Sequence, residues 1–205
     1  MKNSQIKPET KRSLRIQRGQ KTSARLVAIA RQAFSAGGYS DTAMEEIVQK
    51  AGVTRGALYH HFDGKKGLFL AAFEDAQTDI ANRIIEVDKS KRSIWEKFIS
   101  CTFAFFEACL DSQIQRIVLI DAPAILGWDV WRRVDEEKTL HLLRSHLQAL
   151  VKGGIIKSFP IEPLTHLISG AANEAVLWIA GSEDPRKAFN EAWATMEKLL
   201  YSLRK

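Results

Sequence analysis

Apolar residues recur along most of this 205-residue chain at the three- and four-residue spacing of an α-helix. The first such stripe places five side chains on one helix face: Leu26, Ile29, Ala30, Ala33 and Phe34. Strand-like alternation and internal repeats are not apparent. Hydrophobic residues make up 45% of the chain, enough to bury a core. The sequence therefore predicts an all-α fold of one or two domains.

Capping residues mark the expected starts of four N-terminal helices: Thr22 or Ser23, Thr42, Thr54 and Asp63. Thr42 and Glu45 fit a capping box, in which a hydroxyl and a carboxylate satisfy free backbone amides at a helix start. Gly37-Gly38 is expected to end the first helix. Beyond residue 90 we expect helical segments near 93–106, 113–120, 128–151 and 162–181, and a last helix after Pro185.

Positive charge is concentrated at the N-terminus. Residues 1–70 contain 13 Lys and Arg against 5 Asp and Glu, whereas residues 71–205 contain 17 against 19. Residues 1–21 alone contain seven against one and are interpreted as a flexible basic arm. Such asymmetry favours a polyanionic partner. The arm either places arginines in a DNA minor groove or is solvated without a partner.

Residues 43–61 have the pattern of a helix-turn-helix. Ile47 and Val48 on the first short helix are expected to pack against Leu58 on the second, and Gly52 supplies the turn. The second helix then presents its N-terminus outward, where Arg55 can reach the O6 and N7 atoms of guanine. The hydroxyls of Thr54 and Tyr59 suit phosphate oxygens, and Lys65 adds a charge nearby.

The same run resembles the DNA-binding domain of TetR-type (TetR/AcrR) transcriptional regulators. The matching residues are Gly37-Gly38-Tyr39, Thr42, Ile47, the continuous stretch from Ala51 to Phe62, Lys65 and Leu68-Phe69. The match covers about residues 22–70 and differs at Lys66, where an acidic residue is common in the family. The resemblance implies phosphate contacts for Thr42, Thr54, Tyr59 and Lys65. It implies contacts with bases, or a close approach to them, for Arg55, Gly56 and His60.

The resemblance further implies a homodimer on a palindromic operator and a C-terminal ligand-binding and dimerisation domain. We divide the chain into an arm (1–21), a three-helix helix-turn-helix domain (22–70) and a helical domain (71–205). The last two helices offer small residues and apolar anchors for a dimer interface: Ala171, Ala175, Phe189, Trp193, Met196 and Leu200. Candidate ligand-pocket residues are Phe103, Phe106, Asp121, Trp128, Trp131, His146, Leu147, Asn173, Glu174 and Trp178. Core packing is the alternative for each of these residues.

Several other kinds of protein are not expected. The chain lacks the Gly-x-Ser-x-Gly, phosphate-loop and His-Glu-x-x-His motifs of common enzymes. His141 and His146 point about 140° apart on a helix, so no metal site and no cofactor are predicted. Asp135-Glu136-Glu137 is interpreted as a solvated helix face. Cys101 and Cys109 are too far apart on one helix to form a disulfide.

With no signal peptide and no membrane span expected, we predict a cytoplasmic protein. The predicted function is that of a ligand-released repressor that binds double-stranded DNA as a homodimer. An activator, or a regulator without a small ligand, is the first alternative. An all-α enzyme or interaction protein is the remote one.

Overall fold

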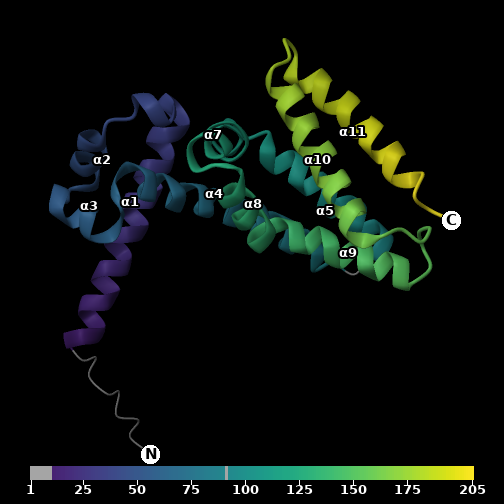
Figure 1. Ribbon diagram of the computed structural model, residues 1–205, viewed down its shortest axis with the longest axis horizontal. Helices are drawn as coiled ribbons and strands as arrows, with labels where there is room; N and C mark the ends of the chain where they lie inside the picture. The colour runs from purple at the N-terminus through teal and green to yellow at the C-terminus, as the bar shows by residue number, and fades with distance from the viewer. Residues whose placement is uncertain (1–10, 91) are drawn as a thin grey trace, which may run out of the picture.

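The computed structural model describes residues 11–90 and 92–205, with side chains placed from Ile16 onward. Throughout this part of the chain the secondary structure is helical, apart from an isolated antiparallel bridge between Ile156 and Arg204. The prediction of an all-α fold is confirmed. Two helical regions lie next to each other, and one long helix, α4, runs from the first into the second (Figure 1).

The N-terminal region consists of α1 (Lys11–Asp41), α2 (Met44–Ala51), α3 (Arg55–His61) and the start of α4 (Gly64–Asp88). The domain boundary that we placed at residue 70 falls inside α4. This helix therefore belongs structurally to both regions.

The C-terminal region is built from seven α-helical and two π-helical segments within the described ranges: α5 (Ile94–Cys109), α6 (Ser112–Gln115), η1 (Arg116–Asp121), α7 (Ala122–Leu126), α8 (Trp128–Asp135), η2 (Glu136–Leu140), α9 (His141–Lys152), α10 (Ile161–Ala180) and α11 (Pro185–Tyr201). α10 and α11 pack as a hairpin at the end of the molecule far from α3 (Figure 1). In the described residues, no helix combines the length and hydropathy needed to cross a membrane.

The first helix starts earlier than expected. α1 begins at Lys11, so the predicted start at Thr22 or Ser23 is wrong, and residues 11–21 of the expected flexible arm are helical. Inside the helix, the Thr22 hydroxyl donates to the carbonyl of Arg18, one turn earlier, at 3.0 Å. Lys, Arg and Gln dominate this stretch, and all three favour a helix without needing burial. Residues 1–10 of the predicted arm lie outside the described residues.

The predicted capping box at Thr42 is also wrong. Ala43 occupies the N-cap of α2, with no side-chain hydrogen bond to the helix. The Thr42 hydroxyl instead donates toward the carbonyls of Gly38, at 2.7 Å, and Ala33, at 3.2 Å. Gly38, with φ 76° and ψ 172°, breaks the regular geometry near the end of α1. The Thr42 hydroxyl therefore caps the end of α1, because the turn at Gly38 brings the Gly38 and Ala33 carbonyls close to it.

Thr54 and Ser93 cap their helices through side-chain hydrogen bonds, whereas Asp63 does not. Thr54 accepts a hydrogen bond from the Ala57 amide at 3.2 Å. Ser93 and Glu96 form a complete capping box on α5. Asp63 occupies the N-cap of α4 but makes no side-chain hydrogen bond there.

Two clusters of buried apolar side chains hold the helices together. The first core runs from Leu26 and Phe34 on α1, through α4, to η1 and Trp131 on α8, and so crosses from one region to the other. The second core lies among α5, α9, α10 and α11 and includes Phe106 and Leu147. Removal of these side chains from water is the main favourable contribution to folding.

Both cysteines lie on α5, buried and unbridged, as predicted. Burial raises the pKa of the Cys101 thiol to about 11 and that of Cys109 far above its ordinary value. Both thiols are therefore protonated at neutral pH and poorly reactive.

A polar contact joins the two regions beside Gly38. The Asp121 carboxylate, at the end of η1, accepts a hydrogen bond from the Tyr39 amide at 3.1 Å and lies 3.8 Å from Nε of Arg116. The Arg116 guanidinium covers Gly38 closely, since a Cβ added there would lie 2.3 Å from Nη2. Asp121, which we had expected in a ligand pocket, therefore lies at the junction between the regions.

Candidate nucleic-acid interface and C-terminal cavity

α2 and α3 form the expected helix-turn-helix. Gly52 adopts φ 61° and ψ 37°, a left-handed conformation in which a side chain would be strained, and its amide closes α2. Ile47 and Leu58 are fully buried between the helices. The turn therefore fixes the angle at which α3 leaves the domain.

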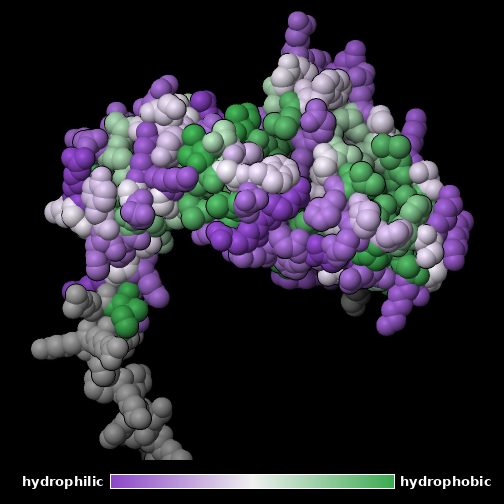
Figure 2. Space-filling view, in the orientation of Figure 1, coloured by the Kyte–Doolittle hydropathy of each residue, from purple (hydrophilic) through white to green (hydrophobic). Residues whose placement is uncertain are grey.

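The predicted DNA-reading side of α3 faces solvent. Thr54, Arg55, Gly56, Tyr59 and His60 are all exposed, and Tyr59 is 52% exposed although it is aromatic. The α3 N-terminus, with its free amides and partial positive charge, carries the first three of them. Hydrophilic side chains prevail over this end of the molecule (Figure 2). Such a surface suits a phosphate-lined groove.

Arg55 makes only weak contacts within the chain. Its Nη2 lies 3.3 Å from a Glu45 oxygen, and both side chains are about two-thirds exposed, at 67% and 66%. Its guanidinium carbon lies 6.0 Å from the centre of the Tyr59 ring. An exposed ion pair of this kind contributes little to stability. Arg55 can therefore exchange Glu45 for the edge of a base.

The other two predicted phosphate ligands are more constrained. Thr42 is only 8% exposed, with its hydroxyl directed to α1, so this geometry favours a role in positioning α2 over a direct contact. Nζ of Lys65 donates to the Ser40 carbonyl at 3.0 Å and lies 4.7 Å from the centre of the Tyr39 ring. Lys66, in contrast, is exposed. Lys66 was noted in the sequence only as a departure from the family pattern.

α1 approaches the recognition helix α3 around Gly19, about two turns after α1 begins at Lys11. Gly19 lies against His61 at the end of α3, where an added Cβ would be 3.7 Å from Cε1 of the ring. Arg18, Lys21 and Arg25 are exposed along this part of α1. The helical part of the basic segment therefore extends the positive surface beside α3.

A small cavity lies in the C-terminal region between α5, η2, α9 and α10. Its volume is about 60 Å³, room for a few water molecules and well below the roughly 300 Å³ of a drug-sized site. The polar residues that line it include Thr102, Asp135, Thr139, His146 and Ser169, among apolar neighbours such as Phe98 and Leu143.

Of the predicted ligand residues, His146 lines this cavity. Phe106 and Leu147 are fully buried in the second core, and Phe103 meets Trp193 edge-to-face, with ring centres 4.8 Å apart. Trp131 is buried and donates from Nε1 to the Val118 carbonyl at 2.7 Å, while Trp128 stacks on it from the surface. Glu174 and Trp178 border a hollow between α10 and α11, and Asn173 is half-buried on α10.

Asp135 is a functional candidate that sequence reasoning missed. We expected a solvated carboxylate, but it is 5% exposed and accepts hydrogen bonds from Thr139 at 2.7 Å and Arg132 at 3.0 Å. Burial raises the pKa of this carboxyl, although the bonds from Thr139 and Arg132 oppose the rise. A π-helical turn follows it directly, and such turns often mark functional sites.

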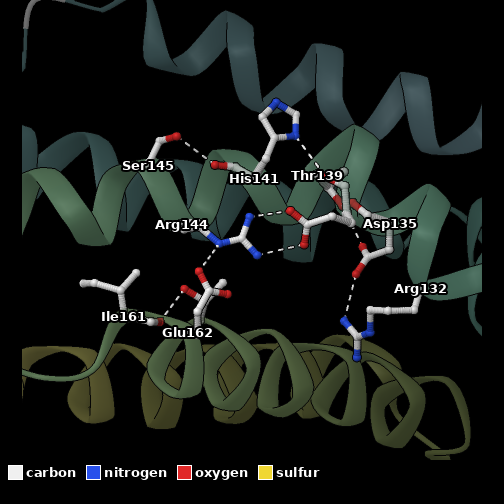
Figure 3. Close-up of polar contacts among 10 residues, drawn as sticks. Arg132, Asp135, Thr139, His141, Arg144, Ser145, Ile161 and Glu162 are labelled. Carbon is white, nitrogen blue, oxygen red and sulfur yellow. Dashed lines mark hydrogen bonds and ion pairs between the residues drawn. The ribbon is translucent and has the colours of Figure 1, made fainter.

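A cationic side chain fastens α9 to its neighbours next to the cavity. The Arg144 guanidinium points between Glu136 on η2 and Glu162 on α10 (Figure 3). Its Nη2 donates to Glu136 at 2.8 Å, and its Nε lies 2.8 Å from Glu162. These contacts hold the pKa of Glu136 below its ordinary value. They fix the relative positions of three helical segments around the cavity.

The outer face of α10 and α11 leaves apolar side chains uncovered. Leu167 is 71% exposed, Trp178 53% and Leu199 56%. With the small residues Ala171 and Ala175 they form a surface that we call the α10–α11 face. Hydrophobic side chains also show at this end of the molecule in Figure 2. Exposed apolar side chains gathered in this way are typical of interaction surfaces.

Four of the predicted dimer residues are buried or half-buried within their own chain, although Met196 also borders the hollow beside Ala171 and Ala175. Met196 and Leu200 are 5% and 1% exposed within the second core. Phe189 and Trp193 are half-buried and contact the rings of Phe103 and Phe106. These side chains anchor α11 to its own chain. Leu167 and Leu199 were not among the predicted dimer residues, although Leu167, Ala171, Ala175 and Trp178 follow helical spacing in the sequence and so share one face of α10.

An exposed recognition helix on a three-helix domain, joined to a helical body with a cavity, defines a helix-turn-helix transcriptional regulator. Comparison with known proteins agrees with this class. Residues 26–72 match the bacterial regulatory proteins of the tetR family, and residues 95–203 match a domain described as Tetracyclin repressor-like, C-terminal. The chain belongs to the TetR family, as the sequence motif had indicated.

Individual relatives support the assignment. The HTH-type transcriptional repressor AcnR of Corynebacterium glutamicum is 44% identical over 154 residues, 72% of this chain and 82% of that protein. The transposon Tn10 TetC protein of Escherichia coli is 26% identical over 145 residues, 71% of this chain and 73% of that protein. A TetR-family regulator from Pectobacterium atrosepticum has a solved structure with a TM-score of 0.78 and 34% identity, and the match covers 96% of this chain and 98% of that one.

Proposed function

We propose that the protein is a transcriptional repressor that binds a palindromic operator as a homodimer and is released by a small effector. The observation that carries the DNA-binding part is the uncovered face of α3, with Arg55 near the helix N-terminus. One relative, AcnR, is named as a repressor, which supports the direction of regulation. In the dimer, two α3 helices would enter successive major grooves, about 34 Å apart.

The exposed apolar side chains of the α10–α11 face support the proposal of a homodimer. Its exposed Trp178 is the kind of side chain that carries binding energy at protein interfaces. Leu167 and Leu199 surround it with further apolar area, and Ala171 and Ala175 allow helices to approach closely. We propose that a second copy packs α10 and α11 here, forming a four-helix bundle. The proposed interface retains Ala171 and Ala175, which were predicted from the sequence, and adds Leu167, Trp178 and Leu199.

Replacing Trp178 with glutamate is expected to weaken the dimer by at least about 30-fold, because an interface anchor contributes ~2 kcal/mol or more. Size-exclusion chromatography with light scattering over a dilution series measures the change. Trp128→Glu is the matched control, because Trp128 is also exposed, at 58%, but lies on α8. Equal dissociation of both variants, or of neither, would contradict this interface.

The cavity in the C-terminal region supports the proposal that a small effector binds there. Asp135 and His146 offer a carboxyl and an imidazole among apolar walls, the composition of a small-molecule site. Since the volume is about 60 Å³, the effector is either very small or enters as α9 and α10 move apart. A ligand that binds only the moved arrangement shifts the population away from the DNA-binding state. A coupling of ~1–3 kcal/mol gives a 5–150-fold loss of operator affinity.

The proposed function is tested by a gel-shift assay on DNA from upstream of the protein's own gene, followed by selection from random sequence. We expect a retarded band in the gel shift and a palindromic sequence from the selection. Small compounds are then screened for the ability to release the protein from this DNA. Deletion of the gene should raise expression of a reporter on that promoter. Reduced expression would identify an activator, and failure to retard any DNA would favour an interaction protein.

Removing residues 1–20 is expected to flatten the salt dependence of DNA binding. The deleted segment contains six Lys and Arg residues and one Glu. The log–log slope becomes shallower by about 0.9 for every phosphate that the protein no longer neutralises. Fluorescence anisotropy at several salt concentrations measures this slope. An unchanged slope would show that the basic segment does not bind DNA.

A further inference from the structure

Three potential metal ligands meet beside the cavity, and each comes from a different helix. Asp88 is the last residue of α4, Cys101 lies on α5 and His146 on α9. Their ligand atoms all lie within 4.8 Å of one another. Donor atoms around tetrahedral zinc are roughly 3.3–3.7 Å apart, given Zn–S, Zn–N and Zn–O bonds of 2.0–2.3 Å. Modest side-chain movement therefore brings the three donors into coordination.

The histidine is held as a metal-binding histidine usually is. Nδ1 of His146 faces the Leu142 carbonyl at 3.0 Å, and Nε2 faces Oδ1 of Asp88 at 3.0 Å. Both ring nitrogens of His146 thus face oxygen atoms, and Nε2 faces the carboxylate that would share the ion with it. A hydrogen bond from Nδ1 to a backbone carbonyl is the common outer support of a histidine that binds metal through Nε2.

The surroundings suit an ion with an open coordination position. Cys101 and His146 both line the cavity, so a fourth ligand can approach from that side. Nζ of Lys97 lies 3.7 Å from Oδ1 of Asp88 and would have to share that oxygen with the ion or move away from it. A thiolate, an imidazole and a carboxylate together select a borderline-soft divalent ion such as Zn²⁺ over Mg²⁺ or Ca²⁺.

We propose that Asp88, Cys101 and His146 bind one zinc-type divalent ion at the edge of the cavity. The thiol proton is released to solvent as the Cys101 sulfur binds the metal. Metal binding is measured without DNA, so failure of this inference leaves the proposed repressor function unaffected. A regulatory effect of the ion would rest on that function.

Co²⁺ is the probe, added to the metal-free full-length protein under a phosphine reductant. One ion per chain should produce near-ultraviolet sulfur-to-cobalt absorption and intense visible bands of a tetrahedral site, both abolished by excess Zn²⁺. Cys101→Ala should lose the sulfur band, whereas the matched Cys109→Ala should retain it, because Cys109 is fully buried outside the cluster. His146→Gln should lose the tetrahedral spectrum, and far-ultraviolet circular dichroism checks that each variant is folded.

Absence of these bands from the wild-type protein would overturn the proposal. So would a sulfur band that persists in folded Cys101→Ala or disappears in folded Cys109→Ala. A tetrahedral spectrum unchanged in His146→Gln would also overturn it.

Discussion

Replacing Gly38 with alanine is expected to lower the melting temperature by roughly 5–10 °C, the largest stability effect that we predict for one added methyl group. Gly38 has φ 76° and ψ 172°, a region that is essentially restricted to glycine, so a side chain there costs about 1–3 kcal/mol. The new Cβ would also displace the Arg116 guanidinium and so disturb its 3.8 Å ion pair with Asp121. Thermal unfolding followed by circular dichroism measures the change.

Gly37→Ala is the matched control. A Cβ at Gly37 would meet only the Thr42 hydroxyl, at an ordinary contact distance of 3.6 Å, and no unusual φ is required there. Because alanine favours a helix over glycine by about 1 kcal/mol, the melting temperature should stay constant or rise. A fall of similar size in both variants would show that the Gly38 backbone is not the cause.

Replacing Arg55 with alanine is expected to weaken operator binding by about 1–3 kcal/mol, a loss of roughly 5–150-fold. Arg55 is exposed at the start of α3, and its contact with Glu45 is weak enough to exchange for a guanine edge. Affinity for random DNA should change little, because phosphate contacts dominate non-specific binding. Fluorescence anisotropy with operator and scrambled duplexes compares the two losses.

The Lys66→Ala variant distinguishes the loss of a contact with a base from the loss of a positive charge near the phosphates. Lys66 is an exposed cation in the first turn of α4 and is a candidate for a phosphate contact. Its loss should weaken binding to both duplexes equally and lower the salt slope by about one. If Arg55→Ala behaves in the same way, Arg55 contacts the DNA backbone and not a base.

The features of the fold that depend only on residues adjacent in the sequence could be predicted. Gly52, Thr54 and Ser93 end or begin helices as their local sequence indicates, since each acts within one turn. Thr42 could not be predicted in this way. Its hydroxyl can serve either of two helix ends, and the backbone at Gly38 decides between them.

The C-terminal site was harder to predict for a different reason. Aromatic side chains such as Phe106 and Trp131 suit a core as well as a pocket, and only helix packing decides which one they join. The helical pattern gives the spacing within each helix but not its rotation against its neighbours. The cluster of Asp88, Cys101 and His146 was invisible for the same reason, because its members are far apart in the sequence.

The continuity of the first core limits how this chain can be divided. Leu26 and Phe34 share one buried cluster with Ile117 and Trp131, so a cut at residue 70 would expose apolar surface on both fragments. We expect the isolated N-terminal segment to be poorly folded. A chimaera that transplants the DNA-reading helices onto a relative's body would have to carry α4 and the surface of η1 with them. Substitutions in the shared interior are therefore expected to affect both regions at once, because α4 and η1 contribute to one buried cluster that spans them.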